Sequence, residues 1–393
     1  DQGVLKDIEG APEWASGVAS GVSGIQVLDA HTLDVRLAEP RAYFLRLLAL
    51  TSAGIARRVE GGRLVGTGPF RQAAPAEGAS AERIVLERNP AYFRPGLPLL
   101  SRVELLLCGG REDALQRLAA KEVHIVSYLH ADHIAKAEGA LSEAQVVSGN
   151  SPSTWFLGFN VKQAPFDDVR VRRAVRAGLD VRGLVEQFHR GARVARSLTP
   201  PALLEVDRVH EPRSDVELSR RLLAEAGVPK LALTLFYPPD RDTRAEDAVL
   251  FKPLLEAGLL SIEHVPTADA ESYWQRVREG RLGAVRGNWI ADFADPDNFL
   301  HFLLNSKAQT FYAFGYQSEE FDRLTDEARV AIDPGQRQTL YRKAEALVRE
   351  DCVVVPLYHE RFHAAASPAV QGLRFHPTPP QVRYESLWLA PDA

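Results

Sequence analysis

Five residues near the end of the sequence, His359-Glu-Arg-Phe-His363, form a formal match to the H-E-x-x-H zinc signature. That chemistry needs both histidines on one face of a helix, a glutamate that acts as base, and a third metal ligand. Here the string directly follows a segment typical of a buried strand, and Pro368 limits any helix to about two turns. No later segment offers a third ligand at the usual spacing. We therefore expect two surface or hinge histidines and neither a metal nor a cofactor.

Three aspartates, Asp292, Asp295 and Asp297, lie in the segment Trp289–Phe299, after a short predicted strand and beside aromatic residues. A carboxylate at the C-terminal end of a strand, partly desolvated by Trp289, is a good partner for a ligand ammonium group. The alternatives are a helix cap from Asp295 or Asp297, or a calcium loop. Calcium favours regularly spaced oxygens and a bidentate glutamate, which this segment lacks. We assign Asp295 or Asp297 to capping and keep Asp292 as the ligand candidate.

Residues 170–196 carry eight arginines against only Asp180 and Glu186. Such a stretch could hold a phosphate backbone. The apolar spacing instead describes two amphipathic helices, with Asp180 capping the second, and their arginines would then form a solvated face.

Other catalytic motifs are weak or missing. Gly66-Thr-Gly-Pro-Phe70 lacks the lysine and the following helix of a phosphate-binding loop, so a tight turn that enters a strand is the better interpretation. The spacing of His124, His130 and His133 indicates no metal site, and no nucleophile elbow is present. The sequence gives no support to an enzyme.

Composition sets the broad class. The 393 residues are 45% apolar and 25% charged, which excludes a disordered chain, and no apolar run is long enough to span a membrane. The net charge of −5 offers no general attraction to nucleic acid. The two cysteines, Cys108 and Cys352, exclude a disulfide scaffold, and the sequence does not decide whether they pair. No export-signal pattern opens the sequence, so we expect any such signal to be absent from this chain.

Predicted helices and strands alternate through residues 214–289. Ser214 and Glu217 form a capping box, a strand covers Leu231–Phe236, and helices cover about 245–257 and 271–279. This alternation favours a largely parallel sheet covered by helices. The same rules predict two further helices separated by Pro334–Gly335 and then a buried strand that ends near Tyr358. They also predict strands at His31–Leu37 and Arg102–Leu107.

Several strings, in order and spacing, resemble the family 5 extracellular solute-binding proteins, the dipeptide, oligopeptide and nickel receptors of ABC importers. The resemblance runs through nearly the whole chain. The strings are Val65-Gly-Thr-Gly-Pro-Phe70, Leu86-Glu-Arg-Asn-Pro-Ala-Tyr-Phe93, Phe159-Asn-Val161 with Pro165–Ala174, Trp289–Phe299, and Val355-Pro-Leu-Tyr358 with Gly372-Leu373.

The resemblance implies an α/β, two-lobed fold of the periplasmic-binding-protein type II class, with ligand held in a cleft that a hinge closes. It implies that residues 1–64 are the remainder of an accessory subdomain, that 65–162 and 356–393 form lobe I, and that 163–355 form lobe II. Family members carry a further stretch before the part matched here. We therefore expect the first lobe and the accessory subdomain to be incomplete at the N-terminus, and a second chain or the missing segment to complete lobe I.

The resemblance also implies the site. An aspartate in the Trp289–Phe299 motif pairs with the ligand's α-amino group in peptide-binding relatives, which maps onto Asp292, and Trp289 would line the side-chain pocket. Phe159 and Asn160 would contact the ligand backbone. The arginine that receives the ligand carboxylate would be Arg241 or Arg244.

These expectations define a non-catalytic protein that captures a short peptide or similar amine-bearing solute and delivers it to a membrane ABC permease. The location would be periplasmic, or extracellular and membrane-anchored, and no nucleic acid would be bound. The alternative is a solute-sensing domain of a larger protein that resembles a transcription regulator. The framework strings do not identify the ligand, because they stabilise lobes and hinge.

Overall fold

A computed structural model of the chain describes residues 5–59, 64–73, 82–130, 133–135, 144–206, 213–308, 311–376 and 381–391. Its contacts group the chain into two units. Unit 1 comprises Asp1–Leu47 and Pro152–Glu360, and unit 2 comprises Leu48–Ser151 and Arg361–Ala393. The chain therefore passes between the units after residues 47, 151 and 360. None of the helices in the described part of the chain is long and apolar enough to cross a membrane.

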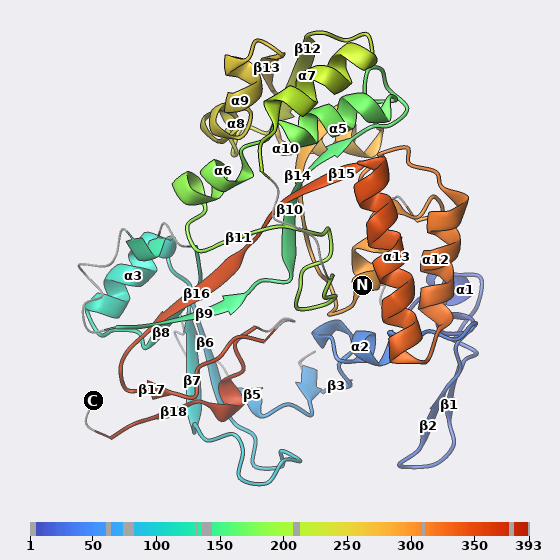
Figure 1. Cartoon of the computed structure of the whole chain (residues 1–393). Coiled ribbons are helices and arrows are strands. Elements are labelled where there is room, and N and C mark those ends of the chain that lie inside the picture. Colours follow the sequence, from blue (N-terminus) through green and yellow to red (C-terminus); the bar gives the residue numbers. More distant parts are fainter. Residues whose placement is uncertain are drawn as a thin grey trace. The chain divides into compact units, whose positions relative to one another are not determined.

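Unit 1 contains most of the helices (Figure 1). Its helical elements are α1 (Ala11–Ala15), α2 (Phe44–Leu48, whose last residue is in unit 2), α5 (Val169–Ala177), α6 (Val181–Phe188), α7 (Val216–Glu225), α8 (Arg244–Leu250), α9 (Lys252–Glu256), α10 (Ala270–Arg278), η3 (Pro296–Asn298), α11 (Leu300–Leu304), α12 (Glu319–Val330) and α13 (Pro334–Asp351). Its strands are β1 (Ile25–Val27), β2 (Leu33–Val35), β10 (Ser153–Phe159), β11 (Arg193–Val194), β12 (Leu231–Tyr237), β13 (Leu260–Pro266), β14 (Ala284–Ile290) and β15 (Val354–His359).

The central sheet of unit 1 has the order β11-β15-β10-β14, and every neighbouring pair in it is antiparallel. Among the described strands, only β12 and β13 form a parallel pair, in a separate two-stranded sheet. The prediction of a largely parallel sheet is therefore wrong. Strand and helix alternate along the chain, as expected, but β10 pairs with segments more than a hundred residues away, and local sequence patterns carry no information about such partners.

Strand β10 separates two hydrophobic cores. Phe156 packs in one core with residues of α10 to α13, whereas Leu157 and Phe159 pack in the other with residues of α5 to α9. Successive side chains of a strand point to opposite faces of its sheet, so both faces of β10 are covered. Gly158 is required in this crowded strand because a Cβ there would lie 2.2 Å from the Phe314 ring.

The helix boundaries follow the capping residues closely. Asp180 caps α6 as predicted, and Pro334 opens α13. The cap of α7 is Asp215, whose side chain accepts from the Leu218 amide, and Ser214 instead donates to the Gly178 carbonyl. The single helix expected over 245–257 is divided into α8 and α9.

Three arginines of α5 cap a neighbouring helix and do not form the solvated face expected from the sequence. Arg172 is 6% exposed and donates to the Asp351 and Cys352 carbonyls. Arg173 and Arg176 donate to the Glu350 and Arg349 carbonyls. These are the last carbonyls of α13, which have no partner inside their own helix and attract positive charge. These three arginines thus cap a neighbouring helix, whereas Arg170, Arg182, Arg190, Arg193 and Arg196 are exposed, as expected of a solvated face.

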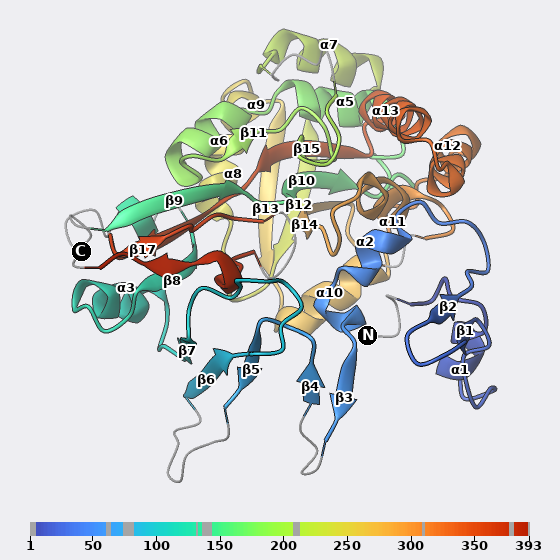
Figure 2. The same ribbon diagram turned by 90° about the horizontal axis from the view of Figure 1, so that it is seen from below.

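Unit 2 is built mainly from short strands (Figure 2). Its elements are η1 (Thr51–Ala53), β3 (Ala56–Arg58), β4 (Leu64–Gly66), β5 (Phe70–Gln72), β6 (Arg83–Arg88), β7 (Arg102–Leu106), α3 (Arg111–Ala119), β8 (Ile125–Leu129), β9 (Gln145–Asn150), β16 (Arg361–Ala366), β17 (Val370–Gln371), η4 (Tyr384–Ser386) and β18 (Trp388–Leu389). The sheets have the orders β3-β4, β5-β6-β7, β8-β16-β9 and β17-β18. The glycine-rich string at residues 66–70 is the predicted turn that enters a strand.

The boundaries of the units lie near the lobe limits expected from the sequence without matching them. The change expected between residues 162 and 163 falls at 151 and 152, and the change expected at 355 and 356 falls at 360 and 361. Residues 1–47 group with unit 1, and 48–64 group with unit 2. The assignment of an accessory subdomain and of lobes I and II stays a prediction. Cys108 and Cys352 are both free thiols.

Candidate functional site

Asp292 follows the end of β14 at the edge of the central sheet of unit 1. The preceding residue, Ala291, donates its amide to the Pro152 carbonyl at 2.8 Å. Pro152 is the first residue of unit 1 after one of the passages between the units. The side chain of Asp292 is exposed to solvent. The start of the acidic segment is thus hydrogen-bonded to the residue at which the chain enters unit 1.

One buried amide connects the two residues that the sequence singled out most strongly. Asn298, 1% exposed, accepts from the Trp289 indole Nε1 at 2.8 Å and from the Asp292 backbone N at 2.9 Å. Its Nδ2 donates to Asp292 Oδ2 at 3.3 Å. Asp292 Oδ1 has no partner among the described residues. The sequence analysis did not identify Asn298, although its amide side chain in the same acidic segment was the available signal.

Trp289 supplies an aromatic wall beside this carboxylate. Its ring stacks on Phe302, with centroids 5.0 Å apart, and meets Phe311 edge-on at 5.5 Å. The indole is half-buried, so part of it remains open to solvent. An anionic oxygen can accept hydrogen bonds from an ammonium group of a ligand. The open aromatic surface next to it can exclude water from an adjacent apolar side chain of the same ligand.

The other two aspartates of the segment are committed to structural partners. Asp295 is fully buried, caps η3 through the Asp297 amide, and makes a bidentate pair with Arg337 at 2.7 and 2.6 Å. The expected capping role is therefore confirmed for Asp295. Asp297 accepts from the Tyr341 hydroxyl at 3.0 Å and lies 3.3 Å from Arg329 Nε. Burial raises the pKa of Asp297 to about 6.

Phe159 and Asn160 are held by the fold rather than presented at its surface. The Phe159 ring is fully buried and stacks on Phe166, with centroids 5.0 Å apart. Asn160 donates its side-chain amide to the Gly280 carbonyl at 2.8 Å and accepts from the Lys162 amide at 3.0 Å. These contacts account for both residues as parts of the framework. Their assignment as ligand residues stays a prediction that the side-chain geometry does not favour.

The two candidate arginines have different surroundings. Arg244 is exposed and pairs with Asp242 at 2.6 Å, so its charge is already matched. Arg241 is half-buried and lies over the Trp155 ring, 3.8 Å from its centroid. Within the described ranges Arg241 makes no ion pair, and burial followed by the nearby Arg286 lowers its pKa. Arg241 is thus the guanidinium with capacity for a new anion.

The histidines of the H-E-x-x-H string lie on two different strands in different units, not on a helix. His359 ends β15, and its Nδ1 lies 2.9 Å from Thr154 Oγ1, while burial lowers its pKa to about 4. His363 lies in β16 with Nδ1 2.7 Å from Ser148 Oγ. Both are buried, so the surface alternative is wrong, whereas the hinge alternative stays a prediction. Across the described ranges, no group of three side chains could hold a metal ion.

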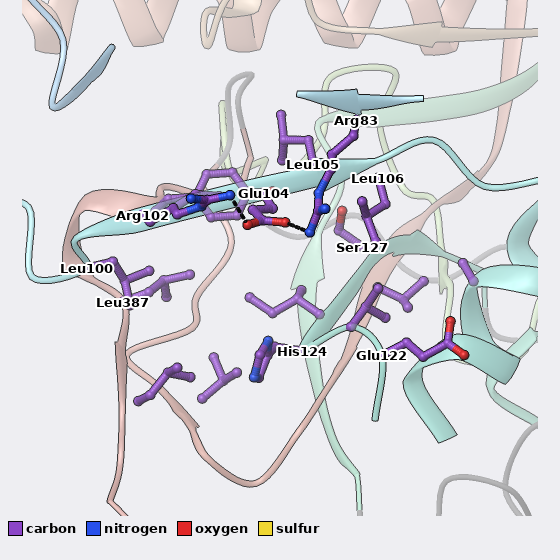
Figure 3. Close-up of a pocket in the computed structure, with 18 of the residues that line it drawn as sticks. Arg83, Leu100, Arg102, Glu104, Leu105, Leu106, Glu122, His124, Ser127 and Leu387 are labelled. Atoms are coloured by element: carbon purple, nitrogen blue, oxygen red, sulfur yellow. Dashed lines mark hydrogen bonds and ion pairs between the residues drawn. The ribbon is translucent and has the colours of Figure 1, made fainter. Parts of the chain in front are cut away.

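A cavity of about 570 Å³ lies elsewhere, within unit 2, and none of the sequence-predicted site residues lines it. Its walls come mainly from β7, β8 and the antiparallel pair β17 and β18. Most of the lining side chains are apolar, for example Leu100, Leu106 and Ile125. Figure 3 shows Arg83 and Arg102 both directed at Glu104, and Arg102 reaches it at 2.6 Å. This groove is chemically unlike the Asp292 site.

Comparison with solved structures establishes the fold. HbpA2 from Haemophilus parasuis matches 96% of this chain and 77% of its own with a TM-score of 0.83 at 20% identity. The unliganded open form of MppA, a periplasmic murein tripeptide binding protein, matches 99% of this chain and 78% of its own at 0.80 and 20%. The fold is therefore that of the periplasmic binding proteins.

Sequence comparison gives the family. Residues 4–311 match the model of the bacterial extracellular solute-binding proteins, family 5, and the chain belongs to that family. The periplasmic oligopeptide-binding protein OppA of Escherichia coli strain K12 is 26% identical over 359 residues, 86% of this chain and 64% of the relative. Heme-binding protein A of Haemophilus influenzae is 25% identical over 89% of this chain and 67% of its own. The chain thus spans less than two thirds of the length of the oligopeptide-binding relative. Nothing in these relatives favours a regulatory protein.

The buried Asp297 predicts a pH dependence of stability. Its pKa is raised on folding, so the folded chain binds this proton more tightly, and the contribution of Asp297 to stability falls as the pH rises from about 4 to about 6. In Asp297→Asn, the free energy of unfolding relative to wild type should rise over this window by up to about 3 kcal/mol. Urea denaturation at pH 4, 5, 6 and 7 measures it.

The matched control is Asp269→Asn. Asp269 is an exposed helix cap whose pKa is lowered, chiefly by the Ser272 amide, so it titrates below this window. Its difference from wild type should stay constant between pH 4 and pH 6. An equally flat profile for Asp297→Asn would contradict the buried-acid interpretation.

Proposed function

We propose that the protein is an extracytoplasmic solute-binding component of an ABC importer, and that it captures a short peptide or similar amine-bearing solute. The observation that carries this proposal is the exposed Asp292 carboxylate, held beside the open Trp289 indole at the sheet edge where the chain enters unit 1. Relatives named for oligopeptide and for dipeptide binding support the peptide class. The membrane partner would be the permease, and the location would be periplasmic or the outer face of the membrane.

The carboxylate of Asp292 would accept a charge-assisted hydrogen bond from the ligand's α-ammonium group. Oδ2 is oriented by Asn298, which leaves Oδ1 available to the ligand. Such bonds are about twice as strong as those between neutral groups, particularly where the ligand excludes water. The indole would cover the first side chain of the ligand. No covalent step is needed, and the solute would leave unchanged.

Removal of the charge tests this assignment. Native mass spectrometry of the protein with a mixture of di- to tetrapeptides first selects a bound peptide, and calorimetry then gives its affinity. Asp292→Asn should weaken binding by about 1.5–3 kcal/mol, because an ammonium group loses its charged partner. N-acetylation of the same peptide should weaken wild-type binding and have little further effect on the variant. Equal affinities of wild type and variant would remove Asp292 from the site.

We propose Arg241, not Arg244, as the group that receives the ligand carboxylate. Arg241 is half-buried and without an ion pair in the described part of the chain, whereas Arg244 is matched by Asp242. Trp155, on which Arg241 lies, is in β10 opposite Asn288, one residue from the pair Thr154 and Trp289. Arg241 and Trp289 therefore lie at the same end of neighbouring strands but on opposite faces of the sheet, so a ligand that reaches both would have to pass around the ends of these strands.

Two matched variants distinguish the arginines. Arg241→Met should lower the affinity for a peptide with a free C-terminus about tenfold or more, while Arg244→Met should change it less than about threefold. Methionine retains the apolar stem, so packing on Trp155 is largely preserved. Amidation of the peptide C-terminus should weaken wild-type binding and leave Arg241→Met unaffected. The reverse order of the two variants would exclude Arg241.

We also propose that further polypeptide, from a second chain or from a segment outside these 393 residues, covers the groove of unit 2. Among the described strands, β7 pairs only with β6. The neighbouring bonds, Leu107 N to Glu82 O and Arg88 N to Ser101 O, indicate that the backbone of Arg102, Glu104 and Leu106 points away from β6. Among the described residues no backbone group pairs with this edge. An unpaired edge beside an apolar groove is a template for another strand.

Amide hydrogen exchange tests whether the outer edge of β7 is unpaired. The amides of Glu104 and Leu106 should exchange much faster than those of Val103 and Leu105, which face β6. If a second copy adds a strand, protection at Glu104 and Leu106 should grow as the protein concentration rises. Fast exchange that does not change with protein concentration would exclude a second copy. The covering polypeptide would then be a segment outside these 393 residues. Strong protection in the dilute monomer would contradict an open edge.

A further inference from the structure

The segment after β14 contains a buried amide, Asn298, that is bonded to both of the proposed ligand residues Trp289 and Asp292. Asn298 is 1% exposed, and its Oδ1 accepts from two donors, the Trp289 indole and the Asp292 backbone. A carbonyl oxygen has two lone pairs, so this oxygen is saturated. Two N–H donors on one side also fix the orientation of the amide, because the reverse orientation would direct the NH₂ group at both of them.

We propose that Asn298 is the positioning residue of the amine site, which holds the indole wall and the acidic residue in one fixed arrangement. This inference rests on the proposed function. Asn298 ties the backbone of Asp292 through Oδ1 and one carboxylate oxygen through Nδ2, so the other oxygen, Oδ1 of Asp292, is the one presented to an ammonium group. The ligand class that fits is a primary amine with an apolar group on the adjacent carbon.

The support of Asn298 comes from farther inside the unit. Asn298 is the last residue of η3, and its backbone N donates to the Asp295 carbonyl at 3.2 Å. Asp295 is itself clamped by Arg337 and also lies 2.9 Å from Arg46. The buried ion pair thus fixes the short helix, the helix fixes the amide, and the amide fixes both ligand-facing residues.

The shared contact with Asn298 determines which amines the site can bind. Because one amide holds both groups, the carboxylate and the indole cannot adjust independently to a ligand. An amine whose neighbouring carbon lacks an apolar group would leave the indole uncovered, and an acetylated amine would leave Asp292 without a charged partner. The site therefore selects ligands that have both a free amine and an apolar group on the adjacent carbon. Because the two protein groups are already fixed in place, less conformational entropy is lost on binding.

Hydrogen exchange on the wild-type chain gives the first test and needs no ligand. The Trp289 indole hydrogen and the Asp292 amide hydrogen should both exchange slowly, although the Asp292 side chain is exposed. Asn298→Leu should release both, whereas Asn298→Asp, which keeps an accepting oxygen, should retain slow exchange at both positions. Asn305→Ala removes another fully buried asparagine and should leave both hydrogens protected. Fast exchange of either hydrogen in the wild-type chain would overturn the proposal.

Binding of trialanine and N-acetyl-trialanine gives the second test. Wild type should prefer the free amine by tenfold or more, and Asn298→Leu should lose most of this preference while Asn305→Ala retains it. If wild type shows no preference but both hydrogens are protected, the proposed function is wrong and the positioning contacts stand. If Asn298→Leu retains the full preference, Asn298 does not position the site. Urea denaturation of each variant separates these outcomes from loss of the fold.

Discussion

The pairing of Asp295 with Arg337 is the interaction on which the arrangement after β14 depends. The carboxylate is fully buried and receives two guanidinium hydrogen bonds at 2.7 and 2.6 Å. An ionised carboxylate in such a place is tolerated only when it is paired and hydrogen-bonded. The same carboxylate caps η3, so the ion pair fixes the point at which the chain turns from the strand into the helix. The direction of Asn298 follows from that turn.

The three aspartates between residues 292 and 297 have different roles because their surroundings differ. Asp292 faces solvent with one oxygen held by an amide, Asp295 is neutralised by arginine, and Asp297 is buried with a raised pKa of about 6 beside Tyr341. Desolvation disfavours the charged form and is the largest cause of the raised pKa of Asp297, and the nearby Arg329 offsets only part of it. Only the exposed carboxylate is available to a ligand.

Local sequence patterns correctly predicted the features that depend on interactions between residues close together in the sequence. The cap at Asp295, the cap at Asp180 and the break at Pro334 depend on residues within a few positions of one another, and each is present in the structure. The family strings were equally informative, and the family match over residues 4–311 confirms the resemblance. Such patterns also placed Asp292 directly after a strand. They could not show that its carboxylate is open while its neighbours are not.

Long-range contacts account for what the sequence did not predict. Arg337 lies 42 positions from Asp295, and the Asp351 and Cys352 carbonyls that accept from Arg172 lie 179 and 180 positions from it. No periodicity records such pairs, so the arginine-rich stretch was interpreted as solvated. The antiparallel sheet was missed for the same reason. Phe159 looked available because its motif is shared by the family, but both faces of β10 are covered and its ring lies in a core.

The location of the site at the sheet edge has a physical consequence. Pro152 accepts the Ala291 amide at 2.8 Å, so the residue at which the chain enters unit 1 is bonded to the residue immediately before Asp292. On the other side, Asn298 ties Asp292 to η3 and its buried ion pair. Asp292 is therefore tied on one side to the residue at which the chain enters unit 1, and on the other side to η3 and its buried ion pair.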